Sequence, residues 1–379
     1  MERDRAMMAN TGRAEHEDLF FQAIVRSYVS RDKNARFLAR PWLAERVETA
    51  LKKDECRFVL LTAEPGAGKT AFMAWLANEH PDWPRYFIRR DQITKLQAAD
   101  DHSFLLRIGY QLAATRPELF SREQVRLVVE QRLGTVEESG EAVGAEFRRL
   151  LASPFYQKVI DIHQYVDRTA GAVTGLKIDE LVIESRLLSA EDLQNMALFD
   201  PARALQATDP EARIVILVDA LDEIRYLGVA GSLLEWLTNC PEMPDNVRFV
   251  LTSRPPDGPT KLFCEKQSPF LQQLTIKPGD EPVQRELEVY ARSLAGEPDV
   301  ASILEGTEAG ADGFVEEAVA KAEGNIGYLD ALARGVDQAR TSKDEEGLRK
   351  LLTLQELPRY IEGLYAFFIR QIKESVSEQ

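Results

Sequence analysis

Cysteine and histidine are scarce in this chain, and neither shows the spacing of metal ligands. The three cysteines, Cys56, Cys240 and Cys264, lie far apart, and the four histidines are equally scattered over the 379 residues. A structural zinc site needs cysteines or histidines a few residues apart, so the sequence excludes one. Three dispersed cysteines also argue against a disulfide framework and are typical of a reducing compartment.

Long apolar runs are absent as well. No stretch of the sequence approaches the roughly 18 consecutive apolar residues that a membrane-spanning helix requires. The first residues, from Met1 to Arg5, lack the apolar core of a secretory signal peptide. We therefore expect a cytoplasmic protein that has no membrane partner.

Basic residues are outnumbered by acidic ones, 47 against 62, which gives a formal net charge of −15. Proteins whose main partner is nucleic acid neutralise its phosphates with clustered lysine and arginine. The charge balance therefore argues against nucleic acid as the main partner. The length of the chain allows two or three domains at roughly 100–200 residues each.

Short apolar runs of strand length are the first pattern that is present. They are rich in valine, isoleucine, leucine and phenylalanine and do not alternate with polar residues, which is typical of strands buried on both faces of a parallel sheet. The runs are Arg57–Thr62, Tyr86–Ile88, Ile214–Val218, Arg248–Thr252 and Leu271–Ile276. Because helical stretches lie between them, we predict an α/β fold whose mostly parallel five-stranded sheet is flanked by helices.

Changes in texture along the chain divide it into successive parts. We expect a charged tail with a short amphipathic helix near Leu19–Val29 (residues 1–36), the sheet domain (37–278), an all-helical lid subdomain (279–352) and a C-terminal helix that could begin a winged-helix unit (353–379). Within the sheet domain, residues from about 91 to 213 are predicted to form a mostly helical insert. Helical spacing of apolar residues predicts insert helices at Ser103–Thr115 and Ala142–Leu151. No internal repeat is visible.

The strongest motif is a glycine-rich loop between a predicted strand and a predicted helix. Its sequence, Ala-Glu-Pro-Gly-Ala-Gly-Lys-Thr, differs from the phosphate-loop pattern G-x-x-x-x-G-K-[ST] in its first residue, Ala63. Glycines let successive backbone N–H groups point at phosphate oxygens, and the positive end of the following helix adds to the attraction. Lys69 would reach the β- and γ-phosphates, and the Thr70 hydroxyl would bind Mg²⁺. The predicted nucleotide-binding residues of the loop are Ala63, Glu64, Pro65, Gly66, Ala67, Gly68, Lys69, Thr70 and Ala71.

A second motif is the acidic end of the predicted strand Ile214–Val218, which runs directly into Asp219. Ligands bind at the carboxyl ends of the strands in open α/β sheets, so Asp219 would hold Mg²⁺ through water. A further carboxylate could orient or deprotonate the attacking water. Asp222 and Glu223 are both candidates for this base; the sequence does not choose between them, and we favour Glu223 slightly.

A third motif, Thr-Ser-Arg-Pro, ends the predicted strand Arg248–Thr252. An arginine at the end of a strand beside two phosphate-site strands can sense or stabilise a γ-phosphate. We therefore predict that Arg254 belongs to the site together with Lys69.

Together these three motifs resemble the STAND class of signal-transduction ATPases, and within it the NACHT-type proteins. The segments that carry the resemblance are Ala63–Thr70, Ile214–Glu223 and Leu251–Pro255. The fold that the resemblance implies is a P-loop NTPase domain of AAA+-like type followed by a helical lid.

Three flanking segments extend the resemblance to about residues 37–370. Phe37–Arg40 resembles the F-x-G-R element that precedes the core of the family, with Ala39 in place of its glycine. Ala322–Leu329 is similar to a stretch of the family's helical subdomain, and Leu357–Tyr365 resembles the helix that follows it.

The resemblance implies a signalling or defence switch that uses ATP or ADP with Mg²⁺. Such a switch is off with ADP and on with ATP, hydrolyses ATP slowly and self-associates when active. The resemblance also implies that Arg254 faces the γ-phosphate, that Gly324–Tyr328 lies near the base, and that Arg40 lies on the ribose and adenine side. Family members continue into a winged-helix domain and sensor repeats. We therefore expect this chain to be part of a longer protein, with effector or sensor partners.

Three other functions share parts of this pattern. An AAA-type ATPase that remodels or loads onto DNA would use the same loop, acidic strand end and lid, but the net charge of −15 argues against it. A scaffold that merely holds a nucleotide is disfavoured by the intact Asp219, Asp222 and Glu223. A metabolite kinase would need an acceptor-substrate signature, and none is visible.

Overall fold

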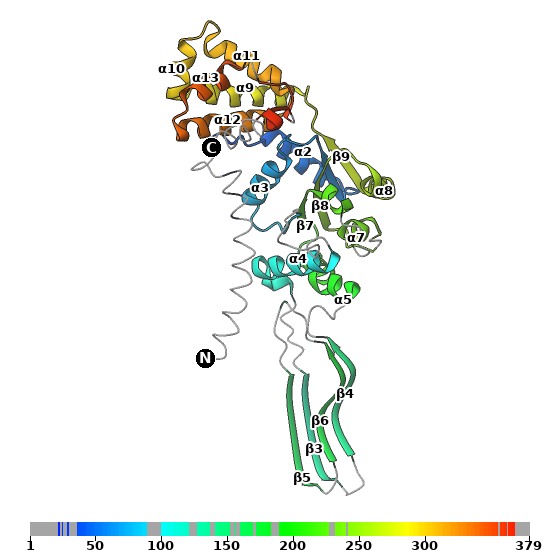
Figure 1. Ribbon diagram of the computed structural model, residues 1–379. Coiled ribbons are helices and arrows are strands. Elements are labelled where there is room, and N and C mark those ends of the chain that lie inside the picture. The colour runs from blue at the N-terminus through cyan, green and yellow to red at the C-terminus, as the bar shows by residue number, and fades with distance from the viewer. Residues whose placement is uncertain are drawn as a thin grey trace. The chain divides into compact units, whose positions relative to one another are not determined.

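The computed structural model describes most of the chain (Figure 1). The chain divides into two compact units. The described residues are 22, 25, 29, 36–88, 100–120, 127–136, 141–151, 155, 160–169, 172–182, 189–226, 232–239, 242–354, 357–361 and 363–367. The first unit contains Met1–His80, Val218–Asp222 and Val250–Gln379, and the second contains Pro81–Leu217 and Glu223–Phe249. These units group the residues differently from the predicted domains, whose boundaries stay a prediction.

A five-stranded parallel sheet runs through the fold in the order β2-β7-β8-β1-β9. Its strands are β1 (Phe58–Thr62), β2 (Arg85–Phe87), β7 (Ile214–Asp219), β8 (Val247–Ser253) and β9 (Leu271–Thr275). Every residue of β1, β7 and β8 is buried, as their uninterrupted apolar sequences predict. The edge strand β9 pairs in parallel with β1 and is more exposed, which explains its two glutamines. The predicted fold class and all five strands are confirmed.

Several helices of the first unit lie next to the sheet strands along the chain. They include α2 (Pro41–Leu51), α3 (Lys69–Glu79) and α8 (Gly258–Lys266), followed by the short 3₁₀ turn η6 (Ser268–Phe270). Proline in the first turn favours the start of α2 and of α8, because the missing N–H is one that has no intrahelical acceptor. An edge-to-face contact between Phe58 and Phe263 packs α8 beside β1, with ring centroids 5.2 Å apart.

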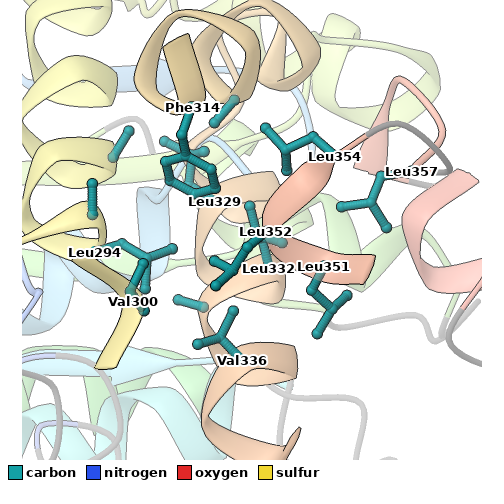
Figure 2. Packing of buried hydrophobic residues seen from close by; sticks show 14 of the residues in the cluster. Leu294, Val300, Phe314, Leu329, Leu332, Val336, Leu351, Leu352, Leu354 and Leu357 are labelled. Carbon is teal, nitrogen blue, oxygen red and sulfur yellow. The ribbon is translucent and has the colours of Figure 1, made fainter. Parts of the chain in front are cut away.

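From Glu281 to Thr353 the first unit is helical, as predicted. This region consists of α9 (Glu281–Ala295), α10 (Pro298–Glu305), α11 (Gly310–Ala322), α12 (Ile326–Ser342) and α13 (Glu345–Thr353). These helices enclose their own core, in which leucines of α12 and α13 meet Phe314 of α11 (Figure 2). Side-chain caps from Asn325 and Asp344 define where α12 and α13 begin. The region is called the lid below.

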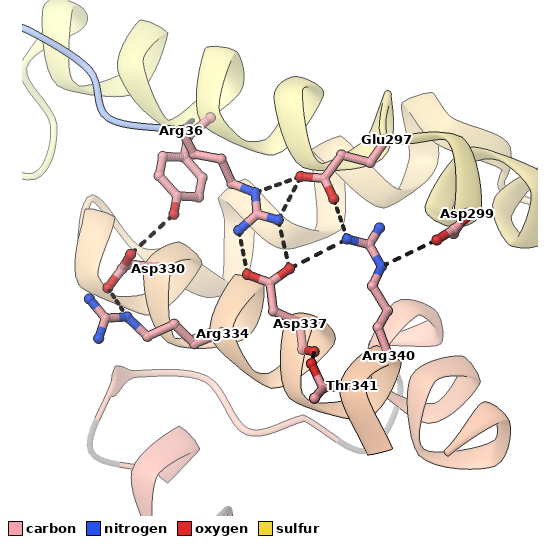
Figure 3. A network of polar contacts seen from close by, with 9 residues as sticks. Arg36, Glu297, Asp299, Asp330, Arg334, Asp337, Arg340 and Thr341 are labelled. Atoms are coloured by element: carbon pink, nitrogen blue, oxygen red, sulfur yellow. Dashed lines mark hydrogen bonds and ion pairs between the residues drawn. The ribbon is translucent and has the colours of Figure 1, made fainter. Parts of the chain in front are cut away.

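An ion-pair network fastens the segment before α2 to the lid (Figure 3). The Arg36 guanidinium donates two hydrogen bonds of 2.9 Å to the carboxylate of Asp337 on α12 and one of 2.7 Å to Glu297. Arg340 binds the other oxygen of Glu297. Hydrogen bonding to Arg36 lowers the pKa of Asp337, although burial opposes the shift.

We predict that Asp337→Asn destabilises the protein by about 1 kcal/mol at neutral pH, since the pair keeps partial contact with water. Because the pKa of Asp337 is lower in the folded protein than in the unfolded chain, the pair stabilises the fold fully at pH values above the unfolded pKa of about 3.9. This stabilisation is lost as the pH falls through the pKa of the folded state. The difference in free energy of unfolding between wild type and variant, measured with urea, should therefore become smaller below about pH 4. Asp312→Asn, which breaks an exposed pair with Arg292, is the matched control with little expected effect. A difference that is constant with pH would contradict the prediction.

Short helices make up much of the second unit. They are α4 (Asp101–Thr115), η2 (Pro117–Leu119), α5 (Ala190–Gln194), the π-helical turn η4 (Asn195–Phe199), α6 (Asp200–Thr208) and α7 (Leu233–Asn239). The turn η5 (Leu221–Tyr226) begins in the first unit and ends in the second. The predicted helix Ser103–Thr115 is confirmed as α4, whose first turn is capped by the Asp100 carboxylate. Phe104 on α4 packs between Tyr86 and Trp236.

The prediction of a helix at Ala142–Leu151 is wrong, because this segment is the strand β4 (Glu141–Leu151). It belongs to a group of four strands with β3 (Leu127–Val136), β5 (Ile160–Thr169) and β6 (Ala172–Val182). Figure 1 shows them as two separate two-stranded parallel sheets, β3 with β5 and β4 with β6. Their apolar residues are interspersed with charged ones at mixed spacing, so helical and strand patterns compete in the sequence. The described residues of the insert are therefore not mostly helical.

Some predictions fall on residues that the structure leaves out. Most of the predicted helix Leu19–Val29 and residues 368–379 of the predicted C-terminal unit lie outside the described residues. Among the residues that are described, no helix has both the length and the apolar character needed to cross a bilayer.

Candidate functional site

The glycine-rich loop joins the end of β1 at Thr62 to the start of α3 at Lys69. Gly66 and Gly68 have φ angles of +81° and +83°, in the left-handed region that side chains with a Cβ rarely adopt. Two left-handed residues in one short loop curl its backbone, and Gly68 forms the N-cap of α3. This is the geometry that directs backbone N–H groups toward an anion at a helix N-terminus.

The Lys69 ammonium lies inside this loop. Its Nζ donates to the carbonyl oxygens of Ala63 at 2.6 Å and Glu64 at 3.0 Å. Burial lowers the pKa of Lys69, while the nearby carboxylates of Asp222 and Asp219 act against this shift. The loop's first residue, Ala63, is buried, so its methyl group fills space where the phosphate-loop pattern has glycine.

Asp219, the last residue of β7, is held by two hydroxyl groups. Thr252 on β8 donates to Asp219 at 2.6 Å, and Thr70 at the start of α3 also hydrogen-bonds to it. Burial raises the pKa of Asp219, and both hydroxyls counter that rise by stabilising the carboxylate. The chain turns sharply after it, since Ala220 has a φ of +65° and donates its N–H to Thr252.

The residues Thr70 and Asp219 fit a Mg²⁺ site. A hydroxyl and a carboxylate lie side by side, and both offer the oxygen atoms that Mg²⁺ prefers. Among the described residues, no group of three histidine, cysteine or acidic side chains is placed to hold a metal. Mg²⁺ commonly takes one or two protein oxygens and completes its shell with water and substrate phosphates, so two protein ligands are sufficient.

Arg254 is paired with Asp222, a contact that the sequence did not predict. The Oδ1 atom of Asp222 accepts the backbone N–H of Arg254 at 3.0 Å, and its Oδ2 atom forms an ion pair with the Arg254 Nε, also at 3.0 Å. Asp222 is 5% exposed, whereas the Arg254 side chain is 44% exposed. The pairing anchors the backbone and the Nε of Arg254. Glu223, the other predicted base, is partly exposed and begins the η5 stretch of the second unit.

Three consecutive carbonyl groups of the loop accept hydrogen bonds, two from the lid and one from Arg40 before α2. Asn325 donates from Nδ2 to the Pro65 oxygen at 2.8 Å, and the Gly327 backbone N–H donates to the Gly66 oxygen at 2.9 Å. The third carbonyl, that of Ala67, accepts the Arg40 Nη1 at 2.6 Å. The start of α12 and the residue before α2 therefore both rest on the phosphate loop.

Arg40 is buried between the loop and the lid. Its Nε pairs with Glu286 of α9 at 2.9 Å, and the Trp42 indole N–H donates to the other oxygen of the same carboxylate at 2.6 Å. Burial lowers the pKa of Arg40, and the charge of Glu286 works against that effect. Arg40, predicted on the ribose and adenine side, thus contacts a loop carbonyl and the lid. Sequence reasoning missed Glu286, because nothing local marks a partner that lies 246 residues from Arg40. It also missed Trp42, which joins the site only through the Glu286 carboxylate.

A cavity of about 200 Å³ opens beside the loop. Its wall is formed by Glu64, Pro65 and Ala67 of the loop, by Ile276–Pro278 after β9, by Ala322–Asn325 before α12, and by Tyr360 and Ile361. Tyr360 has a φ of +67°, an uncommon conformation for a non-glycine residue. Of the other predicted loop residues, Ala71 lies in the first turn of α3.

Comparison with known proteins gives distant structural likenesses. No family model matches this chain, and no curated protein matches it. Among solved structures, it is similar to Cdc6p from Pyrobaculum aerophilum, with 10% identity and a TM-score of 0.39 over 83% of this chain and 63% of that one. It is also similar to the Walker-type ATPase PABY2304 of Pyrococcus abyssi, with 14% identity and a TM-score of 0.37 over 84% and 77% of the two chains. This chain thus spans less than two thirds of the length of Cdc6p.

Proposed function

We propose that this protein is a nucleotide-controlled switch of the STAND/NACHT type, which binds ATP or ADP with Mg²⁺ and hydrolyses ATP slowly. In this proposal the ADP-bound state is closed and inactive, and the ATP-bound state is open and able to assemble. The observation that carries the proposal is the docking of the lid on the phosphate loop through the carbonyls of Pro65 and Gly66.

The docking supports a switch because the same loop would bind phosphate on its N–H side and the lid on its carbonyl side. A ligand shifts a conformational equilibrium only when it interacts differently with the two states. Lys69 and Arg254 carry the positive charges that would distinguish a γ-phosphate from its absence. The cavity beside Pro65 and Tyr360 is proposed to take the base and ribose.

The chemical roles follow from the contacts. Thr70 and Asp219 would hold Mg²⁺, which supplies charge neutralisation on the phosphates when it is bound. One oxygen of Asp222 accepts the backbone N–H of Arg254 and the other forms an ion pair with its Nε, so we assign Asp222 to positioning that arginine. Glu223 is then left as the residue that orients or deprotonates the attacking water.

The proposal is tested with Glu223→Gln, which removes the base and keeps the size of the side chain. We expect ATP turnover to fall by about 10²-fold or more, with nucleotide affinity unchanged. Asp222→Asn should instead weaken ATP more than ADP, since it releases Arg254. Glu265→Gln on the exposed side of α8 is the matched control. Wild-type turnover in Glu223→Gln would remove Glu223 from the role of base.

The same variant tests the switch itself, because it keeps ATP intact during a long measurement. The Gly327 amide, which bonds to the Gly66 carbonyl, should exchange its hydrogen slowly with ADP and faster with ATP. Equal exchange in both states would contradict the switch. The alternative, an ATPase acting on DNA, uses the same site residues, and salt-sensitive binding of duplex DNA in fluorescence anisotropy would favour it.

A further inference from the structure

The four strands β3, β4, β5 and β6 form a motif that the nucleotide site does not use. The chain passes from β3 in one sheet to β4 in the other, and then repeats this path with β5 and β6. Strands β3 and β4 form the first layer of a β-arch, and β5 and β6 form the second. The two layers are joined by the parallel pairing of β3 with β5 and of β4 with β6. We call these strands the β-arch stack.

The two layers of the β-arch stack are chemically alike. The register places Val129 opposite Ile162 and Gln131 opposite Gln164, a step of 33 residues along the chain. In the other sheet Leu150 stands opposite Leu181, a step of 31 residues. The repeat seen here is one of chain path, and the step between the layers differs between the sheets because the loop within each layer has a different length.

Charged residues follow the same register. Glu146 on β4 stands opposite Lys177 on β6, and Arg149 stands opposite Glu180. Opposite charges at paired positions favour this pairing, and like charges there would oppose it. The order of the charges along β4 is thus the complement of their order along β6.

Both sheets of the β-arch stack end in edge strands. Within the described part of the chain, each sheet has two strands, so every strand has a pairing neighbour on one side and an open edge on the other. An edge strand presents a row of backbone N–H and C=O groups that can pair with another chain. The first layer forms one edge of each sheet and the second layer forms the opposite edge.

We propose that a second copy of this chain adds its first layer to the second layer of the β-arch stack. In that arrangement β6 of one copy lies beside β4 of the next, with Lys177 opposite the partner's Glu146 and Glu180 opposite the partner's Arg149. The new contact repeats the contact that already joins the two layers within one chain. This repetition is why a copy of the same chain fits the edge.

The geometry of this contact determines what kind of assembly forms. It joins two different surfaces, the first layer of one copy and the second layer of another, so it is head-to-tail and leaves a free layer at each end. Copies can therefore add one after another. The contact lies within the second unit and uses no residue of the phosphate loop, so it goes beyond the proposed switch and does not depend on nucleotide.

The test uses the full chain in sedimentation velocity, over a series of concentrations and without nucleotide. The wild-type sedimentation coefficient should rise with concentration. A β6 variant, Lys177→Glu with Glu180→Lys, and a β4 variant, Glu146→Lys with Arg149→Glu, place like charges at both positions of every contact. Each should associate about tenfold or more weakly than wild type.

Mixing the two variants separates contacts between chains from contacts within one chain. In an alternating mixture every contact between chains pairs opposite charges again, although each chain keeps its internal mismatch. The mixture should therefore sediment faster than either variant alone. The variant with all four substitutions restores both kinds of contact and should behave like wild type, which also controls for folding.

Several results would overturn the proposal. A wild-type chain that sediments as a monomer at every concentration excludes the proposal. Self-association that is unchanged in both the β6 variant and the β4 variant excludes it too. Lys69→Ala distinguishes it from the proposed function: self-association should persist in that variant even if nucleotide binding is lost. Association that disappears in Lys69→Ala would assign assembly to the nucleotide site.

Discussion

Lys69→Ala is expected to weaken nucleotide binding by about 100-fold or more. The ammonium is placed within the loop by the Ala63 and Glu64 carbonyls, at the position from which it would bond to phosphate oxygens. Losing one or two hydrogen bonds to a charged group costs about 3 kcal/mol, which corresponds to about two powers of ten in affinity. Isothermal titration calorimetry with ATP and ADP measures the change directly.

The control for this prediction is a lysine with the same charge in an exposed place. Lys261 on α8 is 68% exposed and makes a long ion pair with Glu265, so Lys261→Ala should leave nucleotide affinity unchanged. Thermal unfolding without nucleotide should be similar for both variants. Wild-type affinity in Lys69→Ala would show that the loop is not a phosphate site.

Gly324→Ala is expected to cause the largest loss of stability in the lid. Gly324 has a φ of +84°, and an added Cβ would lie 2.7 Å from the carbonyl oxygen of Pro278 and still closer to its Cα and Cβ. The left-handed conformation costs a non-glycine residue about 1–3 kcal/mol. Overpacking against a backbone that cannot rotate away adds about 1–3 kcal/mol. Urea unfolding should therefore show a clearly lower midpoint.

Two other glycines separate these contributions. Gly258 has a φ of +46° and open space around its Cα, so Gly258→Ala measures the conformational cost alone. Gly279, next to Pro278, has open space as well, and Gly279→Ala should be nearly neutral. A loss in Gly324→Ala no greater than that in Gly258→Ala would show that the Pro278 contact contributes nothing.

Gly324 also connects stability to the proposed function. It precedes Asn325, whose side chain bonds to the Pro65 carbonyl, and it lines the cavity beside the loop. Displacing it from Pro278 would move Asn325 and the start of α12 away from the loop. We therefore expect Gly324→Ala to raise the hydrogen exchange of the Gly327 amide even with ADP bound.

Much of the fold could be predicted because its signals are local. The strands β1, β7 and β8 are buried on both faces, and their sequences carry uninterrupted apolar runs. Such runs of strand length are typical of a parallel sheet covered on both faces. The β-arch stack was missed for the opposite reason. Its strands mix apolar and charged residues, and β4 has apolar spacing that a helix also satisfies. The pairing of β4 with β6 decides between the two structures, and pairing is not a local property.

Some features of the site could also be predicted from the sequence, and others could not. Its loop could be recognised because the left-handed turns at Gly66 and Gly68 require glycine, and that requirement is visible in the residues themselves. The anchoring of Arg254 by Asp222 could not, since it joins the ends of two strands that the sheet brings together. The link from Arg40 to Glu286 spans 246 residues and depends on where the lid packs.

The sequence by itself thus determined the parallel sheet, the loop and the helical lid, because backbone conformation and burial constrain residue type position by position. The tertiary structure alone decided which carboxylate holds Arg254, which residues seat the lid on the loop, and that residues 127–182 contain stacked arches. These are contacts between distant segments. A charged or amide side chain can satisfy its hydrogen bonds with many partners, so only packing selects one of them.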